Sequence, residues 1–110
     1  MKNIRLFSLV GQNLSEISEE ILEDAAEASV TTIDLSRNKL SELPNKMSAI
    51  VTVTDLKLIS NHLASLPEWI GEKYKCLQIL DISKNHLQSL PSNIGCLKYL
   101  RDIDISFNRY

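Results

Sequence analysis

The chain has 110 residues, of which 44% are hydrophobic and 24% are charged, so it fits one small domain with a buried core rather than a disordered segment. Its net charge of -2 and its isoelectric point near 5.6 argue against binding to duplex nucleic acid, which normally requires a basic stripe. The start of the chain lacks the apolar region of a secretion signal, and no uncharged run approaches the ~20 residues that span a bilayer. We therefore expect a cytoplasmic protein in which Cys76 and Cys96 are reduced thiols.

The first predicted element lies in residues 4–18, IRLFSLVGQNLSEIS, and it is followed by an alanine-rich segment at residues 21–28, ILEDAAEA. The alanine content and helical spacing predict an α-helix in the second segment. The first segment fits a frame that recurs at residues 30–44, 53–67 and 77–91, and again from residue 100, where it stops in mid-repeat at Tyr110.

Asparagine marks the same position of each later repeat, with glutamine in the first. These five residues are Gln12, Asn38, Asn61, Asn85 and Asn108. The asparagines are 23, 24 and 23 residues apart, and glutamine lies 26 residues before the first of them. A regular period of this length predicts a solenoid. We expect one domain over residues 1–110 with about five repeats, the last incomplete.

Before each asparagine, apolar residues alternate with other residues, a period of two that is typical of a strand with one buried face. The buried pairs are Ile33 and Leu35, Leu56 and Leu58, Leu80 and Ile82, and Ile103 and Ile105. The connections between strands exceed a dozen residues, so the strands pair in parallel. Each asparagine amide can satisfy backbone groups of neighbouring turns, and we expect the five residues to form a structural ladder that is less regular at Gln12.

The return segments carry apolar residues three or four apart after Pro44, Pro67 and Pro91, which predicts short helices or 3₁₀ turns. The expected fold is α/β: a right-handed solenoid with a parallel sheet on its concave face and these helical segments on its convex face.

The pattern L-x-x-L-x-L-x-x-N-x-L with Leu-Pro pairs at residues 43–44, 66–67 and 90–91 resembles the leucine-rich repeat family, and within it the intracellular class with 23-residue repeats. The resemblance implies a non-catalytic scaffold for protein–protein interaction, and it supplies no ligand residues. Complete relatives continue for many more repeats, so we expect this chain to be a fragment.

The side chains between and just after the strand leucines should form the concave binding face. The partner-binding candidates are Asp34, Arg37, Lys57, Ile59, Ile79, Asp81, Lys84, Asp102, Asp104 and Phe107. Ile59 and Ile79 are expected to form an apolar strip, and the three aspartates from residue 81 onward an acidic end. Ile59 and Phe107 are candidate anchors for a partner. The same face could equally be a solvated sheet surface.

His62 and His86 follow asparagines in adjacent repeats and should stack at the rim of the sheet. Lys39 and Arg109 occupy the flanking places, which makes the column basic and hostile to a metal cation. Solvated histidines, or histidines that tune an anionic contact, are the alternatives. Trp69 should lie partly exposed on the outer flank, either as a contact residue or as a cover for the crossover.

No phosphate-binding loop, dinucleotide fingerprint, zinc spacing or serine-elbow motif is present, so we expect no catalysis, no cofactor and no metal. The predicted function is a scaffold that binds another protein, without nucleic acid or membrane insertion. The alternative is a targeting domain cut from a larger enzyme such as a ubiquitin ligase, phosphatase or kinase. The final strand, near residues 100–106, would leave an open edge through which two copies could dimerise.

Overall fold

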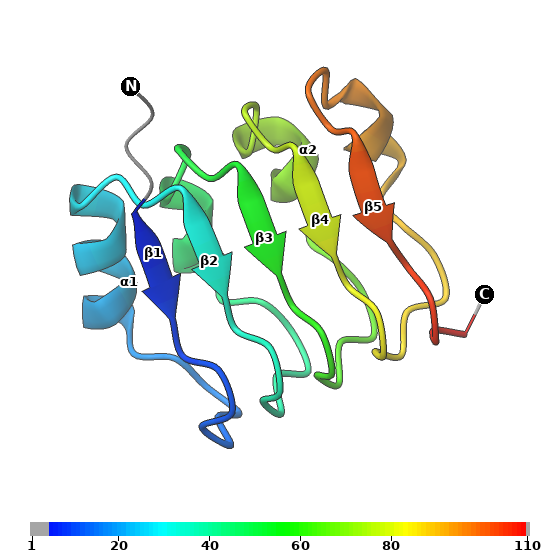
Figure 1. Cartoon of the computed structure of the whole chain (residues 1–110), viewed down its shortest axis with the longest axis horizontal. Helices are drawn as coiled ribbons and strands as arrows, with labels where there is room; N and C mark the ends of the chain where they lie inside the picture. Colours follow the sequence, from blue (N-terminus) through cyan, green and yellow to red (C-terminus); the bar gives the residue numbers. More distant parts are fainter. Residues whose placement is uncertain (1–4, 110) are drawn as a thin grey trace.

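A five-stranded parallel sheet dominates the structure, a computed structural model that describes residues 5–109. The strands are β1 (Leu6–Ser8), β2 (Thr32–Asp34), β3 (Asp55–Lys57), β4 (Ile79–Asp81) and β5 (Asp102–Asp104). They lie in sequence order, each hydrogen-bonded in parallel to the next (Figure 1). This arrangement confirms the predicted α/β solenoid.

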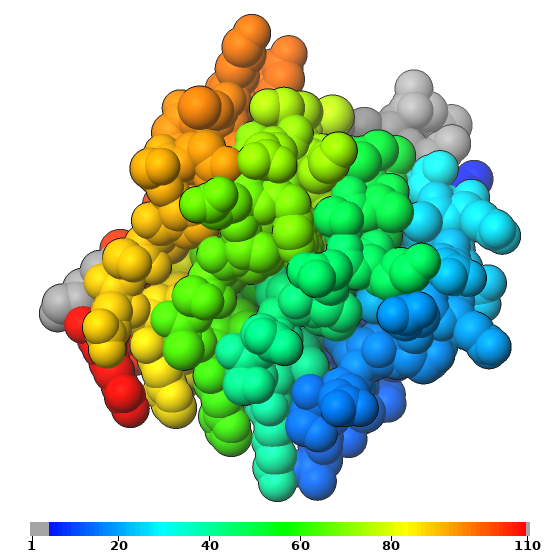
Figure 2. All heavy atoms as spheres, turned by 180° about the vertical axis from the view of Figure 1, so that it is seen from behind, coloured from blue at the N-terminus to red at the C-terminus, as the bar shows by residue number. Residues whose placement is uncertain are grey.

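Four short helical segments connect the strands. They are α1 (Glu19–Glu27), η1 (Asn45–Ala49), α2 (Trp69–Lys73) and η2 (Ser92–Cys96), of which η1 and η2 are 3₁₀-helices. Pro44 and Pro91 directly precede η1 and η2, where their fixed φ suits entry into a helical turn. Seen from behind, successive repeats form neighbouring bands across the convex side (Figure 2).

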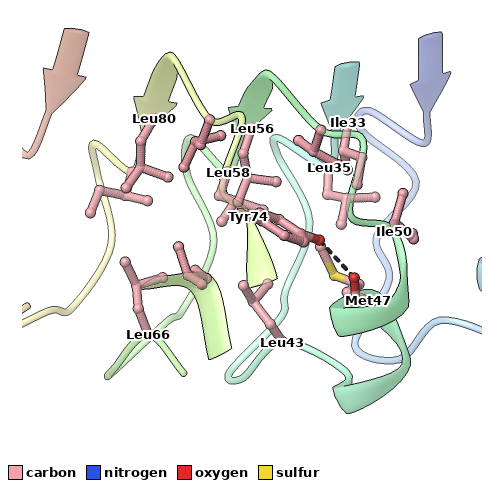
Figure 3. Close-up of a cluster of buried hydrophobic side chains, with 14 of the residues drawn as sticks. Ile33, Leu35, Leu43, Met47, Ile50, Leu56, Leu58, Leu66, Tyr74 and Leu80 are labelled. Carbon is pink, nitrogen blue, oxygen red and sulfur yellow. Dashed lines mark hydrogen bonds between the residues drawn. The ribbon is translucent and has the colours of Figure 1, made fainter. Parts of the chain in front are cut away.

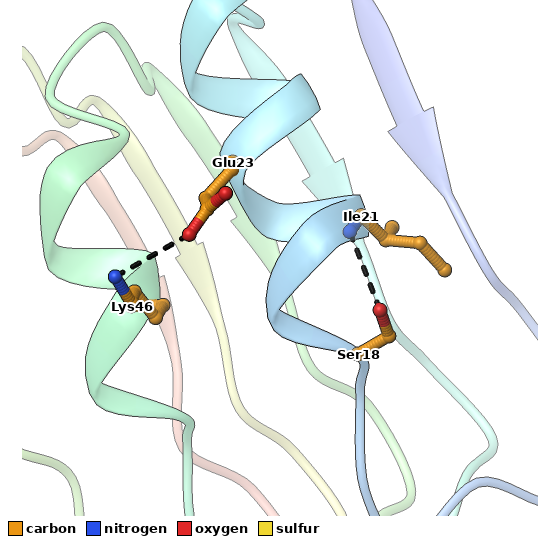
Figure 4. Close-up of polar contacts among 4 residues, drawn as sticks. All are labelled: Ser18, Ile21, Glu23 and Lys46. Carbon is orange, nitrogen blue, oxygen red and sulfur yellow. Dashed lines mark hydrogen bonds and ion pairs between the residues drawn. The ribbon is translucent and has the colours of Figure 1, made fainter.

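The longer helix α1 has defined signals at both ends. The hydroxyl of Ser18 accepts a hydrogen bond from the N–H of Ile21 at 3.5 Å, and two glutamates occupy the first turn, where the helix dipole favours negative charge (Figure 4). At the other end Ser29 adopts φ +52°, and the N–H of Val30 reaches the carbonyl of Ala25. This pattern is a Schellman motif, so α1 ends where the chain must turn back toward β2.

The core lies between the sheet and the helical segments. Leu56 and Leu80 from the strands and Leu58, directly after β3, are fully buried, and Met47 and Tyr74 meet them from the return segments (Figure 3). The hydroxyl of Tyr74 donates a hydrogen bond to the carbonyl oxygen of Met47 at 2.8 Å. Burial raises the pKa of this phenol far above its ordinary value, because the charged form would lose its hydration.

The asparagines form hydrogen bonds between successive repeats. The Nδ2 of Asn61 donates to the carbonyls of Leu35 and Leu58 at 3.0 and 3.3 Å, and its Oδ1 accepts from the N–H of Leu40 at 3.1 Å. Asn85 makes the equivalent bonds one repeat later. Each amide therefore bonds to backbone groups of its own repeat and of the preceding one, and successive asparagines share carbonyl acceptors, as Asn61 and Asn85 share that of Leu58.

Gln12 departs from the predicted ladder. Its side chain is exposed, and the bond it forms to the next repeat comes from its backbone N–H, which donates to the Oδ1 of Asn38 at 3.1 Å. The extra methylene of glutamine carries its amide beyond the position that the shorter asparagine occupies. Within residues 5–109 there is also no earlier strand whose carbonyls this amide could reach. The first repeat is thus irregular, as its sequence predicts, but Gln12 does not extend the side-chain ladder.

Candidate functional site

The register of the strands brings most of the predicted concave-face residues into two columns across the sheet. The first column contains Leu6, Thr32, Asp55, Ile79 and Asp102. The second contains Ser8, Asp34, Lys57, Asp81 and Asp104. All of these side chains are exposed or half-buried, whereas the alternate residues of β2, β3 and β4 are fully buried. The concave face is therefore an accessible surface with a fixed spacing of side chains, about 4.8 Å from strand to strand.

Three aspartates of the second column are held in defined positions by the chain that follows them. The Oδ1 atoms of Asp34, Asp81 and Asp104 accept hydrogen bonds from the N–H two residues later, at 3.0 to 3.2 Å. The hydroxyl of Ser106 also donates to Asp104 at 2.6 Å. Both hydrogen bonds from Ser106 lower the pKa of the Asp104 carboxyl, and the bond from the hydroxyl lowers it more than the bond from the N–H. These carboxylates are fixed acceptors, suited to recognising cations or N–H donors.

The predicted acidic end is a real cluster. Asp81, Asp102 and Asp104 line a shallow hollow of about 350 Å³ over β4 and β5, together with Ile79. The side chain of Arg101 lies 3.6 Å from Asp102 on the exposed edge. Ile103, which is 42% exposed, and Leu80 also line this hollow, so it offers negative charge beside aliphatic residues. Such a surface can hold a lysine or arginine, whose aliphatic stem packs while its charged head is paired.

The predicted apolar strip of Ile59 and Ile79 is wrong. Ile79 pairs with Asp55, which lies four residues before Ile59 along the chain. Ile79 therefore lies beside the start of β3, whereas Ile59 lies just beyond its end. At strand spacing, four residues correspond to roughly 13 Å, too far for side-chain contact. Contact between side chains across a parallel sheet requires a shared column, and Ile79 shares its column with Asp55.

A further column is formed by the residues three positions after the ends of β2, β3, β4 and β5. Arg37, Ser60, Lys84 and Phe107 all have φ between +57° and +60°, the left-handed region that side chains rarely adopt. Phe107 is 76% exposed, and the Nζ of Lys84 lies 5.8 Å from the centre of its ring. The residue types do not predict this conformation, because Gly11, at the same position of the first repeat, is the one glycine of the column.

Outside the concave face, the rim histidines behave as the sequence predicts. His62 and His86 stack with ring centres 5.6 Å apart and planes only 5° apart. Trp69 is half-buried on the outer flank and packs edge-on against Tyr74, with its indole N–H buried among residues 5–109 without a partner.

Cys76 and Cys96 are exposed free thiols. Across residues 5–109 no three His, Cys, Asp or Glu side chains are grouped to hold a metal ion. The same part of the chain contains no helix that is long and apolar enough to cross a membrane.

The parallel sheet, the asparagine hydrogen bonds and the helical return segments together define a leucine-rich repeat solenoid. The leucine-rich repeat family model matches residues 29–49 and 76–97. No curated protein matches the chain by sequence.

Solved structures support the fold over nearly the whole chain. A leucine-rich repeat protein of Leptospira interrogans aligns with a TM-score of 0.71 and 26% identity, over 96% of this chain and 32% of its own. A chain of the Drosophila melanogaster SNF/U2A′ complex aligns with a TM-score of 0.70 and 24% identity, over 94% of this chain and 59% of its own, a likeness of fold alone. The chain thus spans about a third and three-fifths of these two proteins.

Proposed function

We propose that the chain is a single leucine-rich repeat domain that acts as a non-catalytic scaffold and binds a protein partner on its concave face. The observation that carries this proposal is the register of the strands, which holds ordered columns of exposed charged side chains on a rigid sheet. Leucine-rich repeat domains generally mediate protein–protein interaction. A rigid scaffold of this kind can present contact residues on its loops and sheet surface with little backbone rearrangement when a partner binds.

The partner we favour is a protein with a basic contact surface. The concave face presents Asp34, Asp81, Asp102 and Asp104, with Lys57 as the cation between the first two. Phe107 and Ile59 add separate apolar contacts at the ends of the strands. The carboxylates would repel a nucleic-acid backbone, so we propose a protein partner in preference to nucleic acid.

The finer resemblance that we propose is to the C-terminal half of leucine-rich repeat-containing protein 40, within the intracellular class with 23-residue repeats. It is carried by VTTIDLSRNKLSELP from Val30 and LRDIDISFNRY from Leu100. Two free thiols support a reducing compartment, and we propose the cytoplasm. The alternative function is a targeting domain of a larger enzyme such as a ubiquitin ligase, phosphatase or kinase. Coding sequence beyond Tyr110 distinguishes the two, since it would contain either more repeats or a catalytic domain.

Affinity purification from cell extract with a matched pair of charge variants tests the concave-face proposal. The variant Asp81→Lys/Asp102→Lys reverses charge on the concave face, and Glu20→Lys/Glu72→Lys makes the same change on the exposed helical side. We expect quantitative mass spectrometry to find proteins retained by the wild type and by the helical-side variant and lost from the concave-face variant. Loss from the helical-side variant alone would place the binding surface on the convex side and reject the proposal.

We also propose that two copies of this chain associate through the edge at β5. Ile103 is 42% exposed there, Leu100 and Ile105 are half-buried, and β5 is paired on one side only among residues 5–109. Open strand edges and apolar patches favour association. Sedimentation should then reveal a dimer at ~100 μM, where even a contact with a Kd near ~10 μM is populated. A strict monomer at that concentration would reject this association.

A further inference from the structure

The loops that follow the strands form the lower edge of the molecule in Figure 1. Four of these loops carry an exposed cationic or histidine side chain at the same position, and these side chains make a row. It contains the residue directly after each ladder asparagine. These residues are Lys39, His62, His86 and Arg109, and all four side chains are exposed. We call this row the basic ridge. It lies beside the concave face and is separate from the columns described above.

The basic ridge is held rigidly by the backbone. The N–H of each ridge residue donates to a carbonyl of the preceding repeat, that of Leu14, Leu40, Leu63 or Leu87, at 2.7 to 2.9 Å. The preceding asparagine is fixed by its own side-chain hydrogen bonds, as described for Asn61. The stacked rings of His62 and His86, 5.6 Å apart, show the regular spacing that results. A ligand that matches this spacing would therefore bind to a preformed row.

The charges around the basic ridge are mostly of one sign. Lys39 and Arg109 flank the histidines, and Lys84 and Arg37 lie on the neighbouring column toward the concave face. The loop residues after the histidines, LAS at 63–65 and LQS at 87–89, contain no carboxylate. Acidic groups lie on the concave face, where Asp81 is bonded to Ser83, and at the Lys39 end, where Glu16 and Glu42 line one hollow with Leu40. The ion pairs within residues 5–109 join Lys46 to Glu23 and Arg101 to Asp102, so neither involves the ridge.

We propose that the basic ridge binds an extended, carboxylate-rich peptide segment of a partner protein. Side chains on one face of an extended peptide recur about every 6.6 Å, twice the rise per residue, and the histidine rings are 5.6 Å apart, so long glutamate side chains have to bridge a difference of about 1 Å at each step. The exposed ring of Phe107, next to the ridge, offers an apolar contact that a peptide side chain can use. The aspartates of the adjacent concave face disfavour nucleic acid, whose phosphate charge is denser than that of a peptide with alternate carboxylates. This proposal does not depend on the concave-face proposal, because it concerns a different surface and a different charge.

Fluorescence anisotropy with a labelled twelve-residue peptide of alternating glutamate and serine tests the proposal. Three double variants are compared with the wild type in low salt, where surface charges are least screened. Lys39→Gln/Arg109→Gln removes the two permanent charges of the basic ridge, and His62→Gln/His86→Gln removes the two stacked rings between them. Lys73→Gln/Lys98→Gln, which changes two exposed lysines on the convex side, is the matched control. All sites are exposed, and thermal unfolding confirms that each variant is folded.

We expect the wild type and the control to bind the peptide with similar affinity. Loss of Lys39 and Arg109 should weaken binding about tenfold, since each surface charge contributes modestly. The histidine variant should weaken binding less, because it removes the ring N–H donors of the row and leaves the permanent charges in place. The proposal is rejected if the peptide does not bind, if the control loses as much affinity as the ridge variants, or if a twelve-residue oligothymidine of higher charge binds more tightly than the peptide.

Discussion

The interior repeats and the last repeat have the same sequence pattern but very different environments. Leu56 and Leu80 are 0% exposed, whereas Ile103, which pairs with Leu80 in the same register, is 42% exposed. Asn61 and Asn85 are likewise buried, and Asn108 is only half-buried although it makes equivalent bonds. The difference shows that a repeat does not bury its own apolar residues. Burial comes from the repeats on both sides, as expected of a solenoid whose stability depends on contacts between neighbours.

Truncation of the central strand residue should show this comparison most clearly. We expect Leu80→Ala to reduce the free energy of unfolding by about 3 kcal/mol, because it removes a fully buried side chain and leaves a cavity. Ile103→Ala should cost less than about half as much, since water already reaches that position. Urea unfolding of both variants measures the two values. Equal losses would mean that the last repeat is covered by other groups in solution.

Truncation of a ladder asparagine should also reduce the free energy of unfolding more in an interior repeat than in the last repeat, with smaller losses than for the leucines. Asn61→Ala leaves the buried N–H of Leu40 without a partner and removes one of the two amide donors to each of the carbonyls of Leu35 and Leu58, at a cost of roughly 1–3 kcal/mol. Asn108→Ala should cost less, because water can replace the lost bonds at its half-buried site. Lys57→Ala, a concave-face change, is the control and should stay within about 0.5 kcal/mol of the wild type. Urea midpoints for Asn61→Ala and Lys57→Ala that coincide would disprove a buried ladder.

Tyr74 allows a further test within the interior. Tyr74→Phe removes the hydrogen bond to Met47 and should cost about 1 kcal/mol near neutral pH. Burial raises the pKa of Tyr74 in the folded state, so its contribution is present below the ordinary tyrosine pKa near 10 and is lost as the pH rises above it. The wild type should therefore lose more stability than Tyr74→Phe between pH 9 and 11. Parallel alkaline denaturation curves for the two proteins would contradict this.

The exposed end of the concave face should respond without a large change in stability. Ser106 lowers the pKa of Asp104 through two hydrogen bonds, so Ser106→Ala should raise that pKa toward its ordinary value. A depressed pKa contributes stability above the ordinary aspartate range, which is lost as the pH falls through the folded-state value. NMR titration of the Asp104 carboxyl carbon measures the shift directly. An unchanged titration in the variant would show that the hydroxyl does not contact the carboxylate in solution.

The sequence predicts those features that depend on repetition. The strand columns, the helical return segments, the helix in the first repeat and the stacking of His62 on His86 all follow from aligning equivalent positions. It does not predict the features that depend on local backbone geometry or on the full path of the chain. The residues directly before the asparagines adopt the left-handed conformation, but after Gly11 none of them is a glycine that would predict it. The hydrogen bond from Tyr74 to Met47 joins two residues that occupy no equivalent positions in the repeat pattern.

Two interpretations failed because they extended the repeat frame too far. The backbone of Gln12 lies at the position equivalent to the asparagines and donates to Asn38, but its longer side chain lies in solvent. Ile59 and Ile79 both face outward, but they lie in different columns and cannot form one strip. For the concave face and the basic ridge, the sequence identifies which side chains are presented. The charge of these side chains indicates a basic partner surface for the concave face and an acidic peptide for the basic ridge. The charge variants described above test whether these residues bind a partner.

Hydrogen exchange of two equivalent amides tests most directly the claim that neighbouring repeats supply burial and rigidity. The N–H of Leu63 donates to the Oδ1 of Asn85 at 3.1 Å, and the N–H of Leu87 donates to the Oδ1 of Asn108 at 3.0 Å. Their geometry is nearly the same, and they differ in the number of repeats that cover them. We predict exchange at Leu63 at least about tenfold slower than at Leu87 under native conditions, because the edge repeat opens locally while the interior requires global unfolding. Equal protection of the two amides, or faster exchange at Leu63, would contradict the account.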